Sequence, residues 1–165
     1  MRIPKRTIGI PRSALIIGAV TAAMGLLLLW LTPRPTSHLF FVQALPILPP
    51  LWLLLLCHLL CYFAAGAAAG LAWDPYRGRN REAAFWRGIT FLMWGILALS
   101  VWYILLFGKG LYLLSWLCLP LSALCTAIAA ACWMTAGRRS GVIAALCILW
   151  PLLLFLWQFL VILKV

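Results

Sequence analysis

Hydrophobic residues occur along this chain in long blocks separated by short polar segments. Each of five blocks contains about 20 or more mostly apolar residues, the length that a helix needs to cross a hydrocarbon core about 30 Å thick. Backbone polar groups inside a membrane must be satisfied within their own segment, so blocks of this kind are helical. The predicted helices cover residues 13–31, 49–73, 83–107, 111–136 and 141–163.

The connections between these blocks are too short to form a second folding unit. We therefore expect one all-α domain over residues 1–165, an integral membrane protein built as a bundle of five transmembrane helices. Residues 32–48 form the longest connection. Pro151 lies inside the last block and is expected to kink that helix.

The composition supports lipid as the main solvent of the protein. Hydrophobic residues make up 67% of the chain, charged residues only 9%, and the mean hydropathy is +1.11. A soluble domain has about a quarter of its residues charged. A water-soluble fold of this chain would lack a polar surface, so the principal partner is the lipid bilayer.

The net charge of +11 is a topological signal and does not indicate nucleic-acid binding. The basic residues lie in short loops between apolar blocks, and no basic and aromatic surface domain exists to bind a strand. One side of the predicted bundle carries ten Lys and Arg residues and the other three, and the basic side of a membrane protein faces the cytoplasm. The N-terminus is therefore expected in the cytoplasm and the C-terminus outside. The ten are Arg2, Lys5, Arg6, Arg12, Arg77, Arg79, Arg81, Arg87, Arg138 and Arg139, and the three are Arg34, Lys109 and Lys164.

Residues able to carry catalysis are almost absent. Asp74 and Glu82, the only acids, share one loop, and no hydrolase constellation of serine, carboxylate or metal ligands is present. Cys57, His58 and Cys61 resemble a metal cluster in sequence, but on a helix His58 points about 100° away from Cys57 and the three do not converge, so we expect no metal site. All six cysteines lie in apolar blocks, where they act as small packing residues. We expect a protein that is not an enzyme.

Gly66 and Gly70 form a Gly-x-x-x-Gly motif in an alanine-rich stretch. Small residues at this spacing let two helices approach closely, so both glycines are predicted helix-packing residues. The motif leaves open whether the contact lies within the bundle or between the subunits of a homodimer.

A set of proline, aromatic and glycine residues in the second predicted helix has a distinctive spacing. Its members are Pro49, Pro50, Trp52, Tyr62, Gly66 and Trp73. This spacing resembles the second helix of the TspO/MBR family (tryptophan-rich sensory protein, or translocator protein). The segment from Trp102 to Gly108 and the position of Pro151 are also similar to parts of that family, as are the chain length, the five helices and the long first loop.

The resemblance implies a receptor-like or transporter-like membrane protein that binds a flat hydrophobic ligand, a porphyrin, haem or sterol-like molecule, in a cavity within the bundle. A sensory or transport role would follow from that binding, with no obligate cofactor. Residues 32–48 are then a candidate lid over that cavity, and the expected location is the cytoplasmic membrane of a bacterium. The ligand-binding residues that it implies are Trp52, His58, Tyr62, Trp94, Trp102 and Phe155.

His58 stands where the family has a pocket tryptophan, and other pocket positions of the family are also replaced, for example by Gly95 and Leu99. The porphyrin breakdown ascribed to some members is therefore not expected here. A charged histidine at this depth would be costly, so we expect a neutral ring with Tyr62 as a candidate hydrogen-bond partner. Facing a tetrapyrrole cavity, a neutral imidazole could instead ligate haem iron.

A different class of function stays open, a non-catalytic scaffold or interaction subunit without a small-molecule ligand. The grooves of such a bundle would contact only other helices. A ligand titration followed by tryptophan fluorescence separates the two classes, because only a bundle with an indole-lined site is quenched saturably.

The bias of basic residues predicts the topology directly. Single cysteines introduced into residues 32–48 of a chain without its native cysteines should react with a membrane-impermeant maleimide added outside. Cysteines introduced near Arg79 should react only after permeabilisation. The reverse labelling pattern would contradict the predicted orientation.

Overall fold

The computed structural model describes residues 12–30, 51–76, 82–135 and 137–163, all of them in helices or the short turns between helices. No β-strand occurs among these residues. The candidate lid, residues 32–48, lies outside the described residues. The elements are α1 (Arg12–Trp30), α3 (Leu51–Tyr76), α4 (Glu82–Tyr103), the π-helix η1 (Ile104–Gly108), α5 (Tyr112–Met134), α6 (Arg138–Leu146) and α7 (Leu149–Ile162).

Four segments of the described chain are long and apolar enough to cross a membrane: Trp52–Trp73, Ala83–Gly108, Tyr112–Met134 and Arg138–Ile162. The first predicted span corresponds to a shorter apolar helix, Arg12–Leu28. The described chain is thus an all-α structure with the character of an integral membrane protein.

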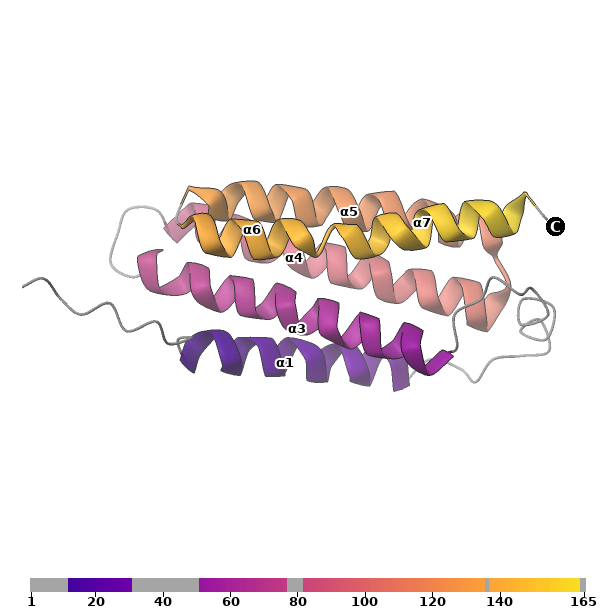
Figure 1. Ribbon diagram of the computed structural model, residues 1–165, viewed down its shortest axis with the longest axis horizontal. Coiled ribbons are helices and arrows are strands. Elements are labelled where there is room, and N and C mark those ends of the chain that lie inside the picture. Colours follow the sequence, from indigo (N-terminus) through magenta and orange to yellow (C-terminus); the bar gives the residue numbers. More distant parts are fainter. Residues whose placement is uncertain (1–11, 31–50, 77–81, 136, 164–165) are drawn as a thin grey trace, which may run out of the picture.

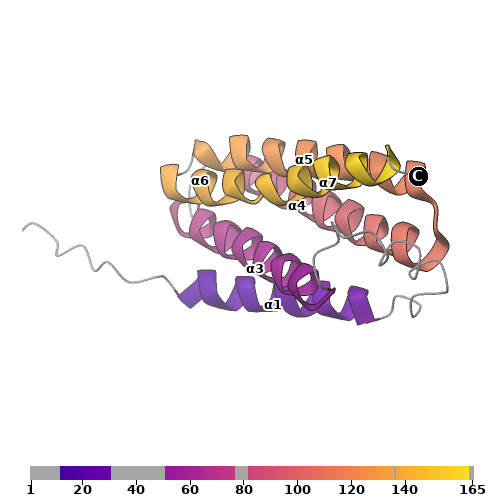
Figure 2. The same ribbon diagram turned by 45° about the vertical axis from the view of Figure 1, so that its right-hand side comes forward.

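The helices lie side by side along one long axis (Figure 1). α3 packs along α1 on one side and against α6 on the other, while α5 packs against α4, α6 and α7 (Figure 2). α1 touches α4 only slightly, so it is held mainly by α3. Between α4 and α5 the chain reverses at Gly110, whose φ of 66° is a left-handed conformation that favours glycine.

Glycines make the close contact between α1 and α3. A Cβ atom added at Gly66 would lie 2.7 Å from the carbonyl oxygen of Ile17 and would also collide with the Thr21 side chain. A Cβ atom at Gly70 would lie 2.7 Å from the backbone nitrogen of Ala14. Both residues of the Gly-x-x-x-Gly motif therefore face α1 of the same chain.

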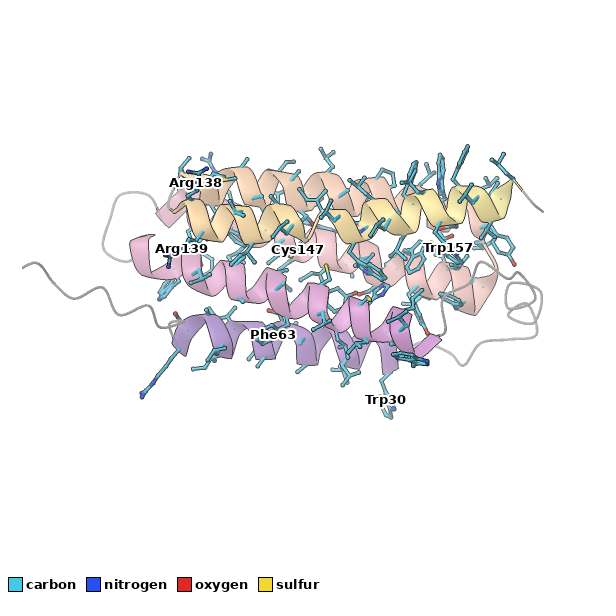
Figure 3. All side chains as sticks on the ribbon, in the orientation of Figure 1. Trp30, Phe63, Arg138, Arg139, Cys147 and Trp157 are labelled. Atoms are coloured by element: carbon cyan, nitrogen blue, oxygen red, sulfur yellow. The ribbon has the colours of Figure 1, made fainter. Side chains whose placement is uncertain are left out.

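The predicted fifth helix is divided into α6 and α7, with the break at Cys147 and Ile148. Pro151 explains its position, because a proline has no N–H to donate to the carbonyl four residues earlier, which is that of Cys147, and its ring crowds that carbonyl. Figure 3 shows Cys147 near the middle of the bundle, with Arg138 and Arg139 at one end. The two helices still form one apolar span of 25 residues.

The glycine contact predicts a loss of stability when its space is filled. Gly66→Leu should lower the melting temperature in detergent, since overpacking a close contact costs about 1–3 kcal/mol. Gly66→Ala should also destabilise, although alanine is intrinsically the better helix former by about 1 kcal/mol.

Gly137→Ala is the matched control, because a Cβ atom there would meet only the Ser140 hydroxyl at 3.7 Å and φ is an extended −167°. Gly66 variants as stable as Gly137→Ala would show that α1 and α3 are not closely packed at this point.

Candidate functional site

Three of the six predicted ligand-binding residues meet in the interior of the bundle. His58 from α3 stacks on Trp102 from α4, with ring centroids 5.5 Å apart and an interplanar angle of 11°. Tyr62 lies one helical turn after His58, with its ring edge-on at 6.1 Å. All three side chains are at most 1% exposed.

Two further aromatic rings complete the surroundings of His58. Trp150 from α7 approaches it edge-on at 5.3 Å, and Tyr103 from α4 at 6.3 Å. We call these five residues, His58, Tyr62, Trp102, Tyr103 and Trp150, the aromatic cluster. Protein side chains occupy the space around the imidazole, so the cluster is a packed core.

The hydrogen bonds of His58 differ from the expected bond to Tyr62. Its Nδ1 atom lies 2.9 Å from the carbonyl oxygen of Leu54 and 3.3 Å from the indole nitrogen of Trp150. The first contact needs Nδ1 as a donor and the second needs it as an acceptor, so one tautomer satisfies only one of them. Nε2 has no hydrogen-bond partner among the described residues. The Tyr62 hydroxyl instead pairs with Ser100 Oγ at 3.0 Å.

Beside the cluster lies a buried polar network centred on Gln158 of α7. Trp102 Nε1 donates to Gln158 Oε1 at 2.6 Å. Gln158 Nε2 donates to Ser115 Oγ at 2.7 Å and to the carbonyl oxygen of Tyr112 at 2.8 Å. A single side chain thus connects α4, α5 and α7. An unpaired amide inside an apolar bundle would be costly, so the network fixes how these helices meet.

The network and the aromatic cluster adjoin an irregular helical segment. The π-helix η1 begins directly after Tyr103, and Phe107 within it packs on Tyr103 at 4.7 Å and on Trp102 at 6.0 Å. Short π-helical segments are rare and frequently occur at functional sites. This end of the bundle, where α3 begins and α7 ends, therefore combines the irregular backbone with the buried polar groups.

The other three predicted residues lie apart from the cluster. Trp52 is 66% exposed near the start of α3. Phe155 of α7 stacks on Trp116 of α5 at 4.5 Å. Trp94 of α4 is 59% exposed and lines a groove between α4 and α1. The structure thus does not gather the six residues around one cavity.

The groove between α1 and α4 has a volume of about 480 Å³ and is mostly apolar. Its residues are Thr21, Met24 and Leu28 of α1 and Ile89, Thr90, Met93, Trp94, Ile96 and Leu97 of α4. The groove exists because α1 packs on α3 and leaves a gap beside α4. By contrast, the void bordered by Tyr62, Leu99 and Ser122 inside the bundle is only about 10 Å³, the space of one water molecule.

The described residues form no group of three histidine, cysteine or acidic side chains that could hold a metal ion. Cys57 and His58 are adjacent in sequence, yet Cys57 lines an outer groove whereas His58 is enclosed. The helical geometry therefore separates these side chains.

Sequence reasoning missed the most connected polar residue of the site, Gln158. A glutamine inside a long apolar block is a usable signal, because polar side chains at membrane depth bond across helices. Its partners Trp102 and Ser115 are distant in sequence, so their pairing depends on how the helices assemble.

The bond between Trp102 and Gln158 predicts an energetic coupling between the two side chains. In a double-mutant cycle with Trp102→Phe and Gln158→Leu, thermal unfolding in detergent should give a coupling energy of about 0.6–1.7 kcal/mol. The same cycle with Trp86→Phe should give none, because Trp86 is exposed and its ring packs on Trp73 and Phe85. Equal coupling in both cycles would refute a specific bond.

We compared the chain with known proteins and found no relative. No protein-family model, no curated protein and no solved structure matches the chain.

Proposed function

We propose that this protein binds a flat hydrophobic ligand, such as a porphyrin, haem or sterol-like molecule, in the membrane, as a diverged member of the TspO/MBR family. A sensory or transport role follows from that binding. The proposal is supported by the residues that resemble the family, from Pro49 to Trp73, and by the groove beside Trp94.

The groove between α1 and α4 is the observation that carries the proposal. Its volume of about 480 Å³ falls within the range of about 300–1,000 Å³ typical of small-molecule sites. The Trp94 indole offers a flat face for stacking. A ligand dissolved in the bilayer reaches a groove on the side of the bundle without crossing its packed interior.

One threonine gives the groove a polar group. The Thr90 hydroxyl donates to the carbonyl oxygen of Trp86 at 3.0 Å and is exposed, whereas the Thr21 hydroxyl donates to the carbonyl oxygen of Ile17 at 2.7 Å and lies against Gly66 of α3. The Thr90 hydroxyl has a single hydrogen, so it retains only acceptor capacity. A ligand with an N–H or O–H donor at its edge is the best match for it.

The proposed topology has five spanning segments, with α1 as the first and the N-terminus in the cytoplasm. α1 has 19 residues and a length of about 28 Å, close to the thickness of a hydrocarbon core. In this orientation the aromatic cluster and η1 lie in the outer half of the membrane, and Arg138 and Arg139 lie at the cytoplasmic end.

A non-catalytic role fits the buried polar groups. Ser122 of α5 donates to the carbonyl oxygen of Gly95 of α4 at 2.8 Å, and Gln158 is engaged by its network. These two side chains hold helices together, and the described residues that line the groove include no general acid or base.

Two tryptophans of α4 provide a matched test of the groove. Protein in nanodiscs is titrated with protoporphyrin, and Trp94→Leu is compared with Trp86→Leu, whose side chain has a similar exposure but lies outside the groove. Trp94→Leu should weaken binding roughly two- to twelve-fold, since an aromatic contact contributes about 0.5–1.5 kcal/mol, and Trp86→Leu should leave it unchanged. Binding that is not saturable in any of the proteins would favour the scaffold function instead.

Haem distinguishes the groove from the interior in the same assay. Because the aromatic cluster encloses His58, we expect haem and protoporphyrin to bind with equal affinity and His58→Ala to leave the Soret band of bound haem unmoved. A shifted band in His58→Ala would instead indicate that the imidazole ligates the iron.

A further inference from the structure

A second groove lies on the opposite side of α3 from α1, between α3 and the α6–α7 pair. Its volume is about 350 Å³. Cys57 and Cys61 of α3 line one wall, and Cys147 and Trp150 line the other. Three of the six cysteines of the chain therefore border one groove.

Two of these cysteines face one another across the helix interface. Cys61 Sγ lies 3.7 Å from the carbonyl oxygen of Cys147, and Cys147 Sγ lies 3.8 Å from the carbonyl oxygen of Cys61. This reciprocal arrangement brings two thiols together from positions 86 residues apart.

The backbone explains why the pair forms at this point. Pro151 has no N–H to donate to the carbonyl of Cys147, and the Cys61 thiol is directed at that same oxygen. Cys147 itself lies at the break between α6 and α7 (Figure 3). The site thus combines two adjacent thiols, a helix break that permits small adjustments, and a groove beside both sulfur atoms.

We propose that Cys61 and Cys147 form a reversible intramolecular disulfide, driven by a lipid-soluble two-electron oxidant of the quinone class that reaches them through this groove. Two S–H bonds break and one S–S bond forms. The thiols lose two electrons and two protons, and the quinone takes up these two electrons and two protons to become the hydroquinone. The disulfide ties α3 to the break between α6 and α7, so it makes the position of α7 dependent on the redox state of the membrane.

The test uses the full chain in nanodiscs with duroquinone, a fully substituted benzoquinone that has no ring hydrogen for a thiol to replace. After oxidation and unfolding, the number of thiols that react with a maleimide should fall from six to four, and the mass of the unlabelled chain should fall by about 2 Da. Peptide mapping should place the link between Cys61 and Cys147, and a dithiol reductant should restore all six thiols.

Serine variants make this result specific. Cys61→Ser and Cys147→Ser should each keep all five remaining thiols, whereas Cys125→Ser, at a buried position on α5, should still lose two of its five. Retention of all six thiols in the parent protein, a link between two other cysteines, or a link between two chains would each overturn the proposal.

Access through the groove is tested separately from the pairing. Leu60 lines the groove and is 58% exposed, whereas Leu56 is exposed on the same helix outside it. Leu60→Trp should slow oxidation by duroquinone at least about threefold, because thiol oxidation depends on access, and Leu56→Trp should not. Equal rates in both variants would overturn the assigned route.

Discussion

The need to satisfy every polar group inside an apolar environment governs how these helices assemble. Water is not available at this depth to complete a missing hydrogen bond, so a buried amide must find protein partners. Gln158 meets this need with Trp102 on α4 and with Ser115 and Tyr112 on α5. Few relative positions of the three helices would satisfy these contacts together. The network therefore sets the register of the α4–α5–α7 unit on which the aromatic cluster rests.

Small residues determine the other half of the bundle. Gly66 and Gly70 bring α1 close to α3, and Gly25 makes room for the ring of Tyr62. Tyr62 in turn bonds Ser100 on α4, so it links the glycine contact to the aromatic cluster. Because α1 is held along this one face, its side toward α4 stays open and forms the groove of the proposed ligand site. Thr21 belongs to both features, since it packs at Gly66 and also lines the groove.

The fifth span shows how a single proline influences a wider region. Pro151 removes one backbone donor, and α6 gives way to α7 at Cys147 and Ile148. The break leaves the span long enough to cross the membrane, yet it directs a carbonyl oxygen toward Cys61 and brings two thiols together. The same span carries Trp150 into contact with His58, so the irregular backbone shapes the aromatic cluster and the thiol pair alike.

The sequence by itself determined that the chain forms long apolar helices, because block length and the absence of charge depend only on local composition. It also identified His58 and Tyr62 as neighbours, since residues four apart share one face of a helix. It did not reveal that Trp102 joins them while Trp52, Trp94 and Phe155 lie elsewhere, because uniformly apolar helices carry no periodic signal of which face turns inward. Only the tertiary structure decided that the residues near His58 fill the interior and that the larger spaces lie in grooves beside α1 and α6–α7. Those features depend on how each helix is rotated, on the glycine contacts and on the hydrogen-bond partners of Gln158.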